Sequence, residues 1–226
     1  MSDNSTPQSI PANNRLVLLG TLLVGIISTF VVLYALTNRP RNFGTPTVDL
    51  SQEYTGVQAL TTPRTVKDFT LVDETNTPVS LSDFRGKMVL MFFGFTNCVD
   101  ICPITMFQFK QVREKLGAKA DEVAMLFISV DPQRDTPSVI ADYMTRFDPA
   151  ITGLVGDTEV FDHIKDDYGL EYVLLPKEGS ETETEYSISH TPNPFLLDRE
   201  GRLVASYAYG TTVDVVSEDI SQRLGA

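Results

Sequence analysis

The chain has 226 residues, of which 42% are hydrophobic and 21% are charged, and its formal net charge is −12. This composition is that of a folded globular protein and excludes a largely disordered chain. The acidic charge argues against nucleic-acid binding, because the protein has no basic surface that could neutralise phosphates.

The first element is an apolar segment at residues 16–38, which contains no charged residue between Arg15 and Arg39. About 20 apolar residues are enough to cross the hydrocarbon core of a bilayer. The segment is too long for a signal peptide, and no small-residue cleavage site follows it. We therefore predict a short N-terminal tail at residues 1–15, a single transmembrane anchor at 16–38 and a linker at 39–65.

The charges around this segment do not decide its orientation. One arginine precedes it, whereas Arg39 and Arg41 follow it, so the positive-inside rule gives no support for an exported domain. Large domains are nevertheless translocated largely regardless of such charges. The N-terminal tail lacks the Arg-rich, amphipathic character of an organelle transit peptide, which favours a bacterial membrane protein.

From Val66 onward, patterns typical of strands and helices alternate. Strands are predicted at 69–73 and 77–81 as a hairpin, at 87–95, 122–131 and 151–156, and in a second hairpin at 193–210. Helices are predicted at 104–117, 136–147, 158–169 and 213–225. This order predicts an α/β domain at residues 66–226 with a central, mostly parallel sheet covered by helices. It is the order of a thioredoxin-like fold with an N-terminal hairpin extension.

The only two cysteines, Cys98 and Cys102, lie where a buried strand meets the start of a helix. Ligands bind outside the carboxyl ends of strands in open α/β sheets. Pro103 disfavours helical geometry at Cys102, so we expect both cysteines in the loop before the helix, where unpaired N–H groups stabilise thiolates. This position favours a functional pair over two packing residues. The spacing alone permits either a disulfide or a metal site.

Two histidines are candidates for a third ligand. His163 lies in a polar helical pattern and is expected at the surface. His190 lies in a loop before a strand, and in thioredoxin-like folds that loop packs beside the cysteine loop. Two thiolates and one imidazole suit copper, because soft thiolates select Cu(I) and imidazole also binds copper. Structural zinc usually has four protein ligands. Either Cu(I) or Cu(II) fits the charge of this ligand set, and three ligands leave the metal exchangeable.

Three segments, "GFTNCVDICPITM", "FISVDPQRDTP" and "SISHTPNPFLLDREGRLVASYAYG", resemble the Sco/SenC family of membrane-anchored, thioredoxin-like copper proteins. The resemblance implies that Cys98, Cys102 and His190 bind copper and that the cysteine pair is redox-active. It also implies a role in assembling the copper A site of cytochrome c oxidase, with oxidase subunit II and other periplasmic copper chaperones as partners. The domain would then lie on the periplasmic side of a bacterial cytoplasmic membrane.

The chain departs from the family pattern at two places. Val99 stands where the family usually has proline, and Ser189 and Thr191 flank the histidine where the family commonly has aspartate and serine. The Thr191–Pro192 pair also aligns with the loop of thiol-disulfide oxidoreductases that carries a cis-proline facing the cysteines. We therefore treat a cis peptide bond before Pro192 as a hypothesis.

Other residues near the cysteines have two interpretations each. Asp100 is expected either to cap the helix after Cys102 or to shape the copper loop. Asp131 ends a buried strand and either satisfies loop N–H groups or supports the metal ligands from behind. Met106 and Phe107 are expected in the core, because their spacing is that of an apolar helix face.

The leading hypothesis is a copper chaperone, a delivery protein rather than a classical enzyme. The alternative is a membrane-anchored thiol-disulfide oxidoreductase that reduces protein cysteines, such as those of the copper A site. A peroxide-reducing protein is disfavoured, because its motif needs other residues around a single reactive cysteine.

Overall fold

The computed structural model describes residues 56–176 and 185–225, together with Ser28, Thr29 and Tyr34. Apart from those three positions, the predicted tail, the predicted anchor and residues 39–55 of the predicted linker lie outside the described residues. Among the residues that are described, no helix is both long and apolar enough to cross a membrane. The chain divides into two compact units, Met1–Gln52 and Glu53–Ala226, and the second contains all the strands named below.

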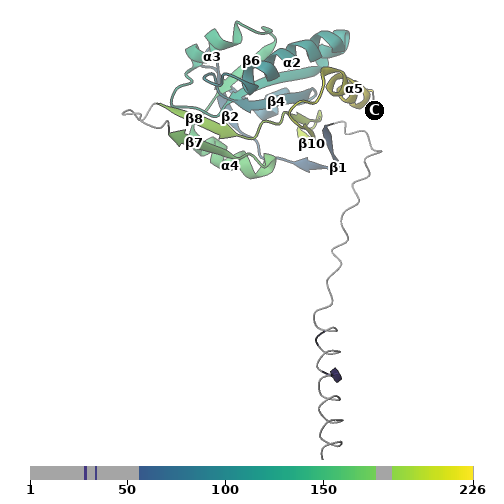
Figure 1. Ribbon diagram of the computed structural model, residues 1–226. Helices are drawn as coiled ribbons and strands as arrows, with labels where there is room; N and C mark the ends of the chain where they lie inside the picture. The colour runs from purple at the N-terminus through teal and green to yellow at the C-terminus, as the bar shows by residue number, and fades with distance from the viewer. Residues whose placement is uncertain (1–27, 30–33, 35–55, 177–184, 226) are drawn as a thin grey trace, which may run out of the picture. The chain divides into compact units, whose positions relative to one another are not determined.

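The second unit alternates strands and helices along the chain (Figure 1). Its strands are β1 (Val57–Thr65), β2 (Thr70–Asp73), β3 (Pro78–Ser80), β4 (Met88–Gly94), β5 (Val123–Ser129), β6 (Ile151–Val155), β7 (Tyr172–Pro176), β8 (Tyr186–His190), β9 (Phe195–Leu197) and β10 (Arg202–Tyr207). Its α-helices are α2 (Ile101–Leu116), α3 (Pro137–Met144), α4 (Thr158–Tyr168) and α5 (Val213–Leu224), and its 3₁₀ turns are η1 (Leu81–Phe84) and η2 (Gly117–Glu122).

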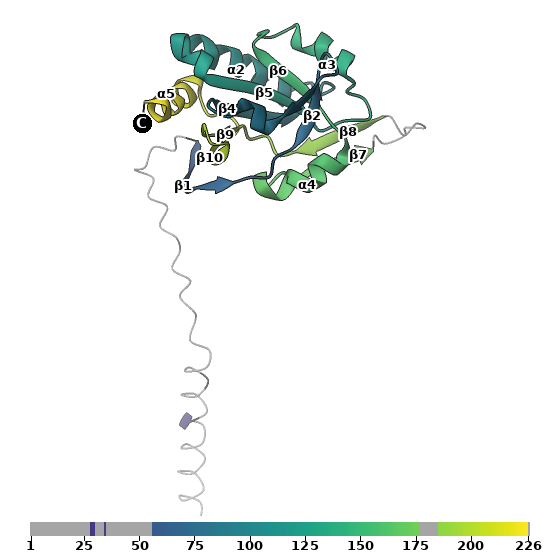
Figure 2. The ribbon, with the colours of Figure 1, turned by 180° about the vertical axis from the view of Figure 1, so that it is seen from behind.

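Eight of these strands form one sheet in the order β1-β10-β9-β4-β5-β6-β2-β3. The central strands β4, β5 and β6 are parallel, whereas β9 pairs antiparallel with β4 and β2 pairs antiparallel with β6. Helices α2, α3 and α5 lie on one side of this sheet, and α4 lies on the other with β7 and β8 (Figures 1 and 2). The predicted α/β class and the predicted β2–β3 hairpin are confirmed. The prediction of a mostly parallel sheet is wrong, because only β4–β5 and β5–β6 are parallel among the seven strand pairings of this sheet.

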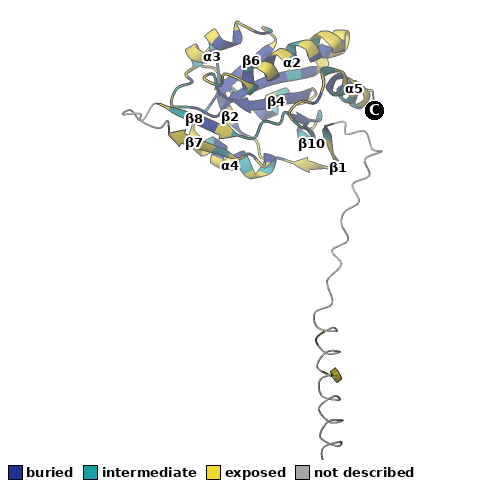
Figure 3. Cartoon of the chain, in the orientation of Figure 1, coloured by how far each residue is buried: buried dark blue, intermediate teal, exposed yellow. Residues whose placement is uncertain are grey.

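The core lies in the middle of the sheet, as the apolar runs predict (Figure 3). All seven residues of β4 are buried, and so are all residues of β5 except Ala124. A strand buried on both faces needs an apolar side chain at every position, which explains why neither sequence alternates between apolar and polar residues. The carboxyl end of β4 therefore presents the cysteine loop from a rigid base.

The start of the domain differs from the prediction. Residues 57–65 were predicted as the end of a linker, but they form β1, which pairs antiparallel with β10. The strand is almost wholly exposed, and its pairing shifts register between Ala59 and Arg64. An exposed edge strand that contains Pro63 carries no apolar alternation, so its sequence looks like a tether.

A second sheet of two strands lies between α4 and β9 in the chain. In it, β7 pairs antiparallel with β8, and Tyr172 is opposite His190. His190 is thus the last residue of a strand, although we predicted it in a loop. Four of the five residues of β7 are exposed, so the strand lacks the pattern of buried positions that would have identified it.

Candidate metal centre

The two cysteines and His190 come together at the carboxyl end of β4. Their ligand atoms, two Sγ atoms and one ring nitrogen, all lie within 4.8 Å of one another. The Sγ of Cys102 is 3.7 Å from Nε2 of His190, and both cysteines are free thiols. Cys102 is buried, whereas Cys98 and His190 are partly exposed. The cluster is therefore reachable from solvent on the side of Cys98 and His190.

The helix that carries Cys102 begins earlier than predicted. It starts at Ile101, so Cys102 and Pro103 both lie in its first turn and not in the preceding loop. Proline is tolerated there because the first N–H groups of a helix have no partner within the helix. Asp100 occupies the N-cap position, but its side chain makes no capping hydrogen bond. Instead, Cys98 Sγ accepts the backbone N–H of Cys102 at 3.4 Å.

In this arrangement the pKa values of the two thiols shift in opposite directions. A hydrogen bond from the Cys102 thiol is the main reason why the pKa of Cys98 is lowered to about 4; the backbone N–H groups of Cys102 and Asp100 lower it further, against the effect of burial. The same hydrogen bond, together with burial, raises the pKa of Cys102. At neutral pH the pair therefore consists of a Cys98 thiolate and a Cys102 thiol.

The imidazole of His190 is oriented by the backbone and by two phenyl rings. Its Nδ1 lies 3.0 Å from the carbonyl oxygen of Thr191, which fits the tautomer in which Nδ1–H donates. That tautomer leaves the Nε2 lone pair facing the sulfur atoms. The rings of Phe92 and Phe95 meet the imidazole edge-on, at centroid distances of 5.8 and 5.7 Å. Orientation of this kind is typical of metal-binding histidines.

Asp135 supports the cysteine loop, and we did not predict it. Its buried carboxylate accepts the backbone N–H of Thr96 at 3.0 Å, the Thr96 hydroxyl at 2.5 Å and the Ser129 hydroxyl at 2.5 Å. Thr96 lies at the beginning of the loop that contains Cys98. The signal in the sequence was the Asp-Pro-x-x-Asp-x-Pro segment, in which Asp135 is the second aspartate.

Asp131 lies deeper in the same segment. Only 1% of the residue is exposed, and its carboxylate binds the guanidinium of Arg134 and the hydroxyl of Tyr186. Among the described residues its carboxylate accepts side-chain donors and no loop N–H group, so the first predicted role is wrong, and it touches none of the three ligands directly. Arg134 and Tyr186 were also absent from our prediction, since their partners lie far away in the sequence.

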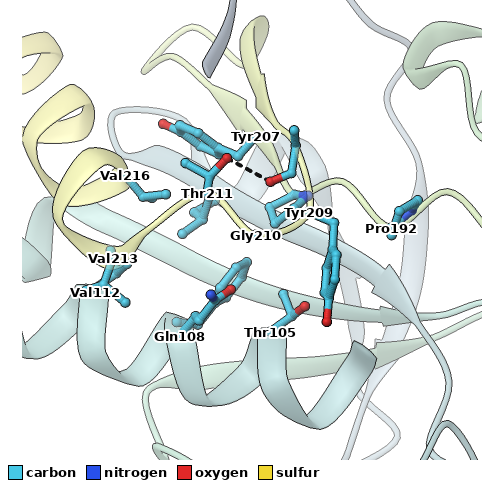
Figure 4. A pocket seen from close by; sticks show the side chains of 14 residues that line it. Thr105, Gln108, Val112, Pro192, Tyr207, Tyr209, Gly210, Thr211, Val213 and Val216 are labelled. Carbon is cyan, nitrogen blue, oxygen red and sulfur yellow. Dashed lines mark hydrogen bonds between the residues drawn. The ribbon is translucent and has the colours of Figure 1, made fainter. Parts of the chain in front are cut away.

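The peptide bond before Pro192 is trans, so the hypothesis of a cis bond is wrong. Thr191 continues the hydrogen bonding of β8, because its N–H donates to the carbonyl of Glu171 at 2.9 Å. This keeps the chain extended up to Pro192, and the trans form is the default for such a bond. Pro192 lines a groove beside α2, together with Thr105 and Tyr209 (Figure 4).

The surface beside the cysteines is partly apolar. Met106 is buried as predicted, but Phe107 is 53% exposed, so its predicted place in the core is wrong. Phe107 lies on the outer side of α2, one turn after Ile104, which is also exposed, and Val99 in the cysteine loop is 95% exposed. The other histidine, His163, is exposed on α4, as predicted.

Comparison with known proteins places this geometry in a family. A family model described as SCO1/SenC matches residues 57–225. The chain is 36% identical to "Protein SCO2 homolog, mitochondrial" of Mus musculus. The similarity extends over 161 residues, which are 70% of this chain and 62% of that relative. The chain thus spans about three fifths of the length of that relative and of the corresponding Bos taurus protein.

Solved structures share the fold. Copper-bound ScoI of Bradyrhizobium japonicum is 33% identical, with a TM-score of 0.63 over 70% of this chain and 98% of that one. Apo Sco1 of Thermus thermophilus is 36% identical, with a TM-score of 0.66 over 75% of this chain and 96% of that one. The predicted thioredoxin-like α/β fold of the second unit is confirmed by its likeness to these structures.

Proposed function

We propose, on the premise that this chain belongs to the SCO1/SenC family, that it is a copper chaperone. The observation that carries the proposal is the cluster of Cys98, Cys102 and His190, whose ligand atoms lie within 4.8 Å of one another. Two sulfur ligands and one imidazole form a donor set that suits copper. The copper-bound structure of a 33% identical relative supports the same assignment.

The site is prepared to take up and release its cargo. The Cys98 thiolate and Nε2 of His190 can bind copper without losing a proton, whereas the Cys102 thiol must release one. Because two of the three ligands are partly exposed, the thiolates of a partner can approach from that side and replace them one at a time. Three ligands hold copper firmly enough to carry it and still permit exchange.

The acceptor that we propose is the copper A site in subunit II of cytochrome c oxidase, with other periplasmic copper chaperones as donors. The family resemblance of the cysteine, aspartate and histidine segments supports this assignment. We further propose that residues 16–38 anchor the chain in a bacterial cytoplasmic membrane with the domain on the periplasmic side. Cell fractionation tests the anchor: the full chain should sediment with membranes and a deletion of 16–38 should not, whereas a full chain in the soluble fraction would refute it.

A second function rests on the divided pKa values of the two thiols. The Cys98 thiolate can attack a disulfide in a partner, which forms a mixed disulfide and releases one partner thiolate to be protonated. The Cys102 thiol then loses its proton and attacks the Cys98 sulfur, which breaks the mixed disulfide and expels the second partner thiolate to be protonated. The partner is thereby reduced, and Cys98 and Cys102 form a disulfide. The same pair can therefore act as a thiol reductant of copper A cysteines in place of, or before, copper delivery.

A transfer experiment separates the two functions. The full chain, loaded with copper in detergent, is mixed with the copper-free copper A domain of oxidase subunit II whose cysteines are reduced. We expect the optical spectrum of the copper A centre to appear. In a parallel sample, the copper-free chain is mixed with the oxidised domain and free thiols are counted. Thiol reduction without copper transfer would leave only the second function, and the absence of both would refute both.

A further inference from the structure

Arg134 connects the strand that carries His190 to the main body of the domain. It lies in the loop between β5 and α3, and only 15% of its side chain is exposed. Its Nε donates to Asp131 at 2.5 Å, and its Nη1 donates to the backbone carbonyl of Tyr186 at 2.7 Å. Tyr186 is the first residue of β8, and His190 is the last. One guanidinium thus binds both the loop after β5 and the start of the strand that bears the histidine.

Arg134 and Asp131 together hold Tyr186 at three points: its backbone carbonyl, its ring and its hydroxyl. The guanidinium carbon of Arg134 lies 3.7 Å from the centre of the tyrosine ring, and the tyrosine hydroxyl donates to Asp131. Among the described residues, β8 pairs with β7 and with no strand of the eight-stranded sheet. The loop after β5 therefore supplies a direct link between β8 and the sheet that presents the cysteines.

Arg134 also faces the ring that contacts the imidazole. Its guanidinium carbon lies 6.0 Å from the centre of Phe95, and Phe95 meets His190 edge-on at 5.7 Å with an interplanar angle of 85°. We propose that Arg134 is a positioning residue for His190: by holding Tyr186 and Phe95, it keeps Nε2 aimed at the cysteine sulfurs. The inference deepens the proposed copper site and rests on it.

The energetics favour a positioning role over a purely stabilising one. Asp131 is 1% exposed, and removing such a charge pair from water costs about as much as its attraction returns. Nη2 of Arg134 is also buried without a hydrogen-bond partner in the described part of the chain. Apolar side chains of the same volume, in place of the charge pair, would often give the fold equal or greater stability. What they could not supply is a planar group that binds a carboxylate, a carbonyl and an aromatic face together.

The chain contains a matched control. Arg223 on α5 donates through Nε to Asp219 at 2.9 Å, and Asp219 accepts the hydroxyl of Tyr207 at 2.8 Å. This trio repeats the Arg, Asp and Tyr arrangement, but no contact of it involves Cys98, Cys102 or His190 among the described residues. Replacement of either arginine by methionine keeps an unbranched side chain of similar length and removes the charge.

The first measurement is Cu(II) affinity in the full chain, for Arg134→Met, Arg223→Met, His190→Ala and the double variant Arg134→Met/His190→Ala. We expect Arg134→Met to weaken binding about 10- to 100-fold, the range typical of residues that orient a metal ligand. Arg223→Met should change the Cu(II) affinity less than about twofold, because Arg223 contacts none of the three ligands. Arg134→Met should have no further effect once His190 is gone, because a residue that acts through the histidine has nothing left to position.

The second measurement needs no metal. In the reduced, copper-free chain, the ring currents of Phe92 and Phe95 shift the NMR signals of the His190 ring protons, because both rings contact the imidazole. Arg134→Met should shift them, and Arg223→Met should not. Unchanged ring signals in Arg134→Met would overturn the inference. So would a loss of Cu(II) affinity on Arg134→Met that is equally large in the parent chain and in His190→Ala. If His190→Ala binds copper as well as the parent chain while the ring signals still shift, the copper site fails and the positioning of the ring stands.

Discussion

Iodoacetamide should alkylate Cys98 of the reduced, copper-free chain at a rate that is nearly constant from about pH 5 to about pH 8. The hydrogen bond from the Cys102 thiol, and those from the backbone N–H groups of Cys102 and Asp100, lower the pKa of Cys98 to about 4. The thiolate is the reacting species, so its population is already complete at the lower end of this range. An ordinary thiol, with a pKa of about 8.5, should react about tenfold faster with each pH unit over the same range.

The size of the effect follows from two opposing factors. At about pH 6 the thiolate fraction of Cys98 exceeds that of an ordinary thiol about 300-fold. The lower pKa reduces the intrinsic nucleophilicity of the sulfur about 100-fold, for a Brønsted coefficient of about 0.4–0.5. We therefore expect Cys98 to react about threefold faster than a free thiol at about pH 6 and about 20-fold slower at about pH 8.

The assay is mass spectrometry of the alkylated chain, with Cys98→Ser as a control that should leave only the buried, unreactive Cys102. Cys102→Ala removes the main donor to the Cys98 sulfur, which destabilises the thiolate and raises its pKa. That variant should regain part of the pH dependence. A parent chain whose Cys98 reactivity climbs tenfold per pH unit between about 6 and 8 would refute the proposed division of the two thiols.

Two further substitutions test what supports the site. Asp135→Ala leaves the N–H and hydroxyl of Thr96 and a buried serine hydroxyl without their acceptor, so the free energy of unfolding should fall by about 2–4 kcal/mol in urea titrations, and an unchanged midpoint would contradict this. At Gly94, a Cβ would lie 2.8 Å from the ring of Phe127 and 3.0 Å from Sγ of Cys102. Gly94→Ala should therefore cost about 1–3 kcal/mol by the same measurement and should weaken copper binding, whereas parent-like values for both would show that the site is loosely packed.

The parts of the fold that could be predicted are those whose local sequence follows from a single structural requirement, such as burial on both faces of a sheet or capping of a helix. Strands β4 and β5 are buried on both faces, so their sequences are apolar apart from Ser129 at the end of β5. Helices α3 and α4 could be placed because Thr136 and Asp157, residue types that favour the N-cap, precede them and accept N–H groups there. The cysteine pair could be placed because it follows such a strand at the end where ligands bind.

The parts that could not be predicted depend on contacts between distant residues. The start of α2 was misplaced because a sulfur atom accepts the Cys102 N–H and does the work of a capping side chain. Arg134 was missed because its partner Tyr186 is 52 residues away, on a strand without a clear pattern. Phe107 has the spacing of a core residue, but it lies on the exposed side of its helix against Phe147. Its exposure could not be read from periodicity alone.

X-ray absorption spectroscopy of the copper-loaded full chain tests the three-ligand site most directly. We expect two sulfur scatterers and one imidazole nitrogen around copper, supplied by Cys98, Cys102 and His190. In His190→Ala the nitrogen shell should disappear while both sulfur scatterers stay. A parent spectrum with sulfur ligands alone, unchanged in His190→Ala, would contradict the assignment of His190 as the third ligand.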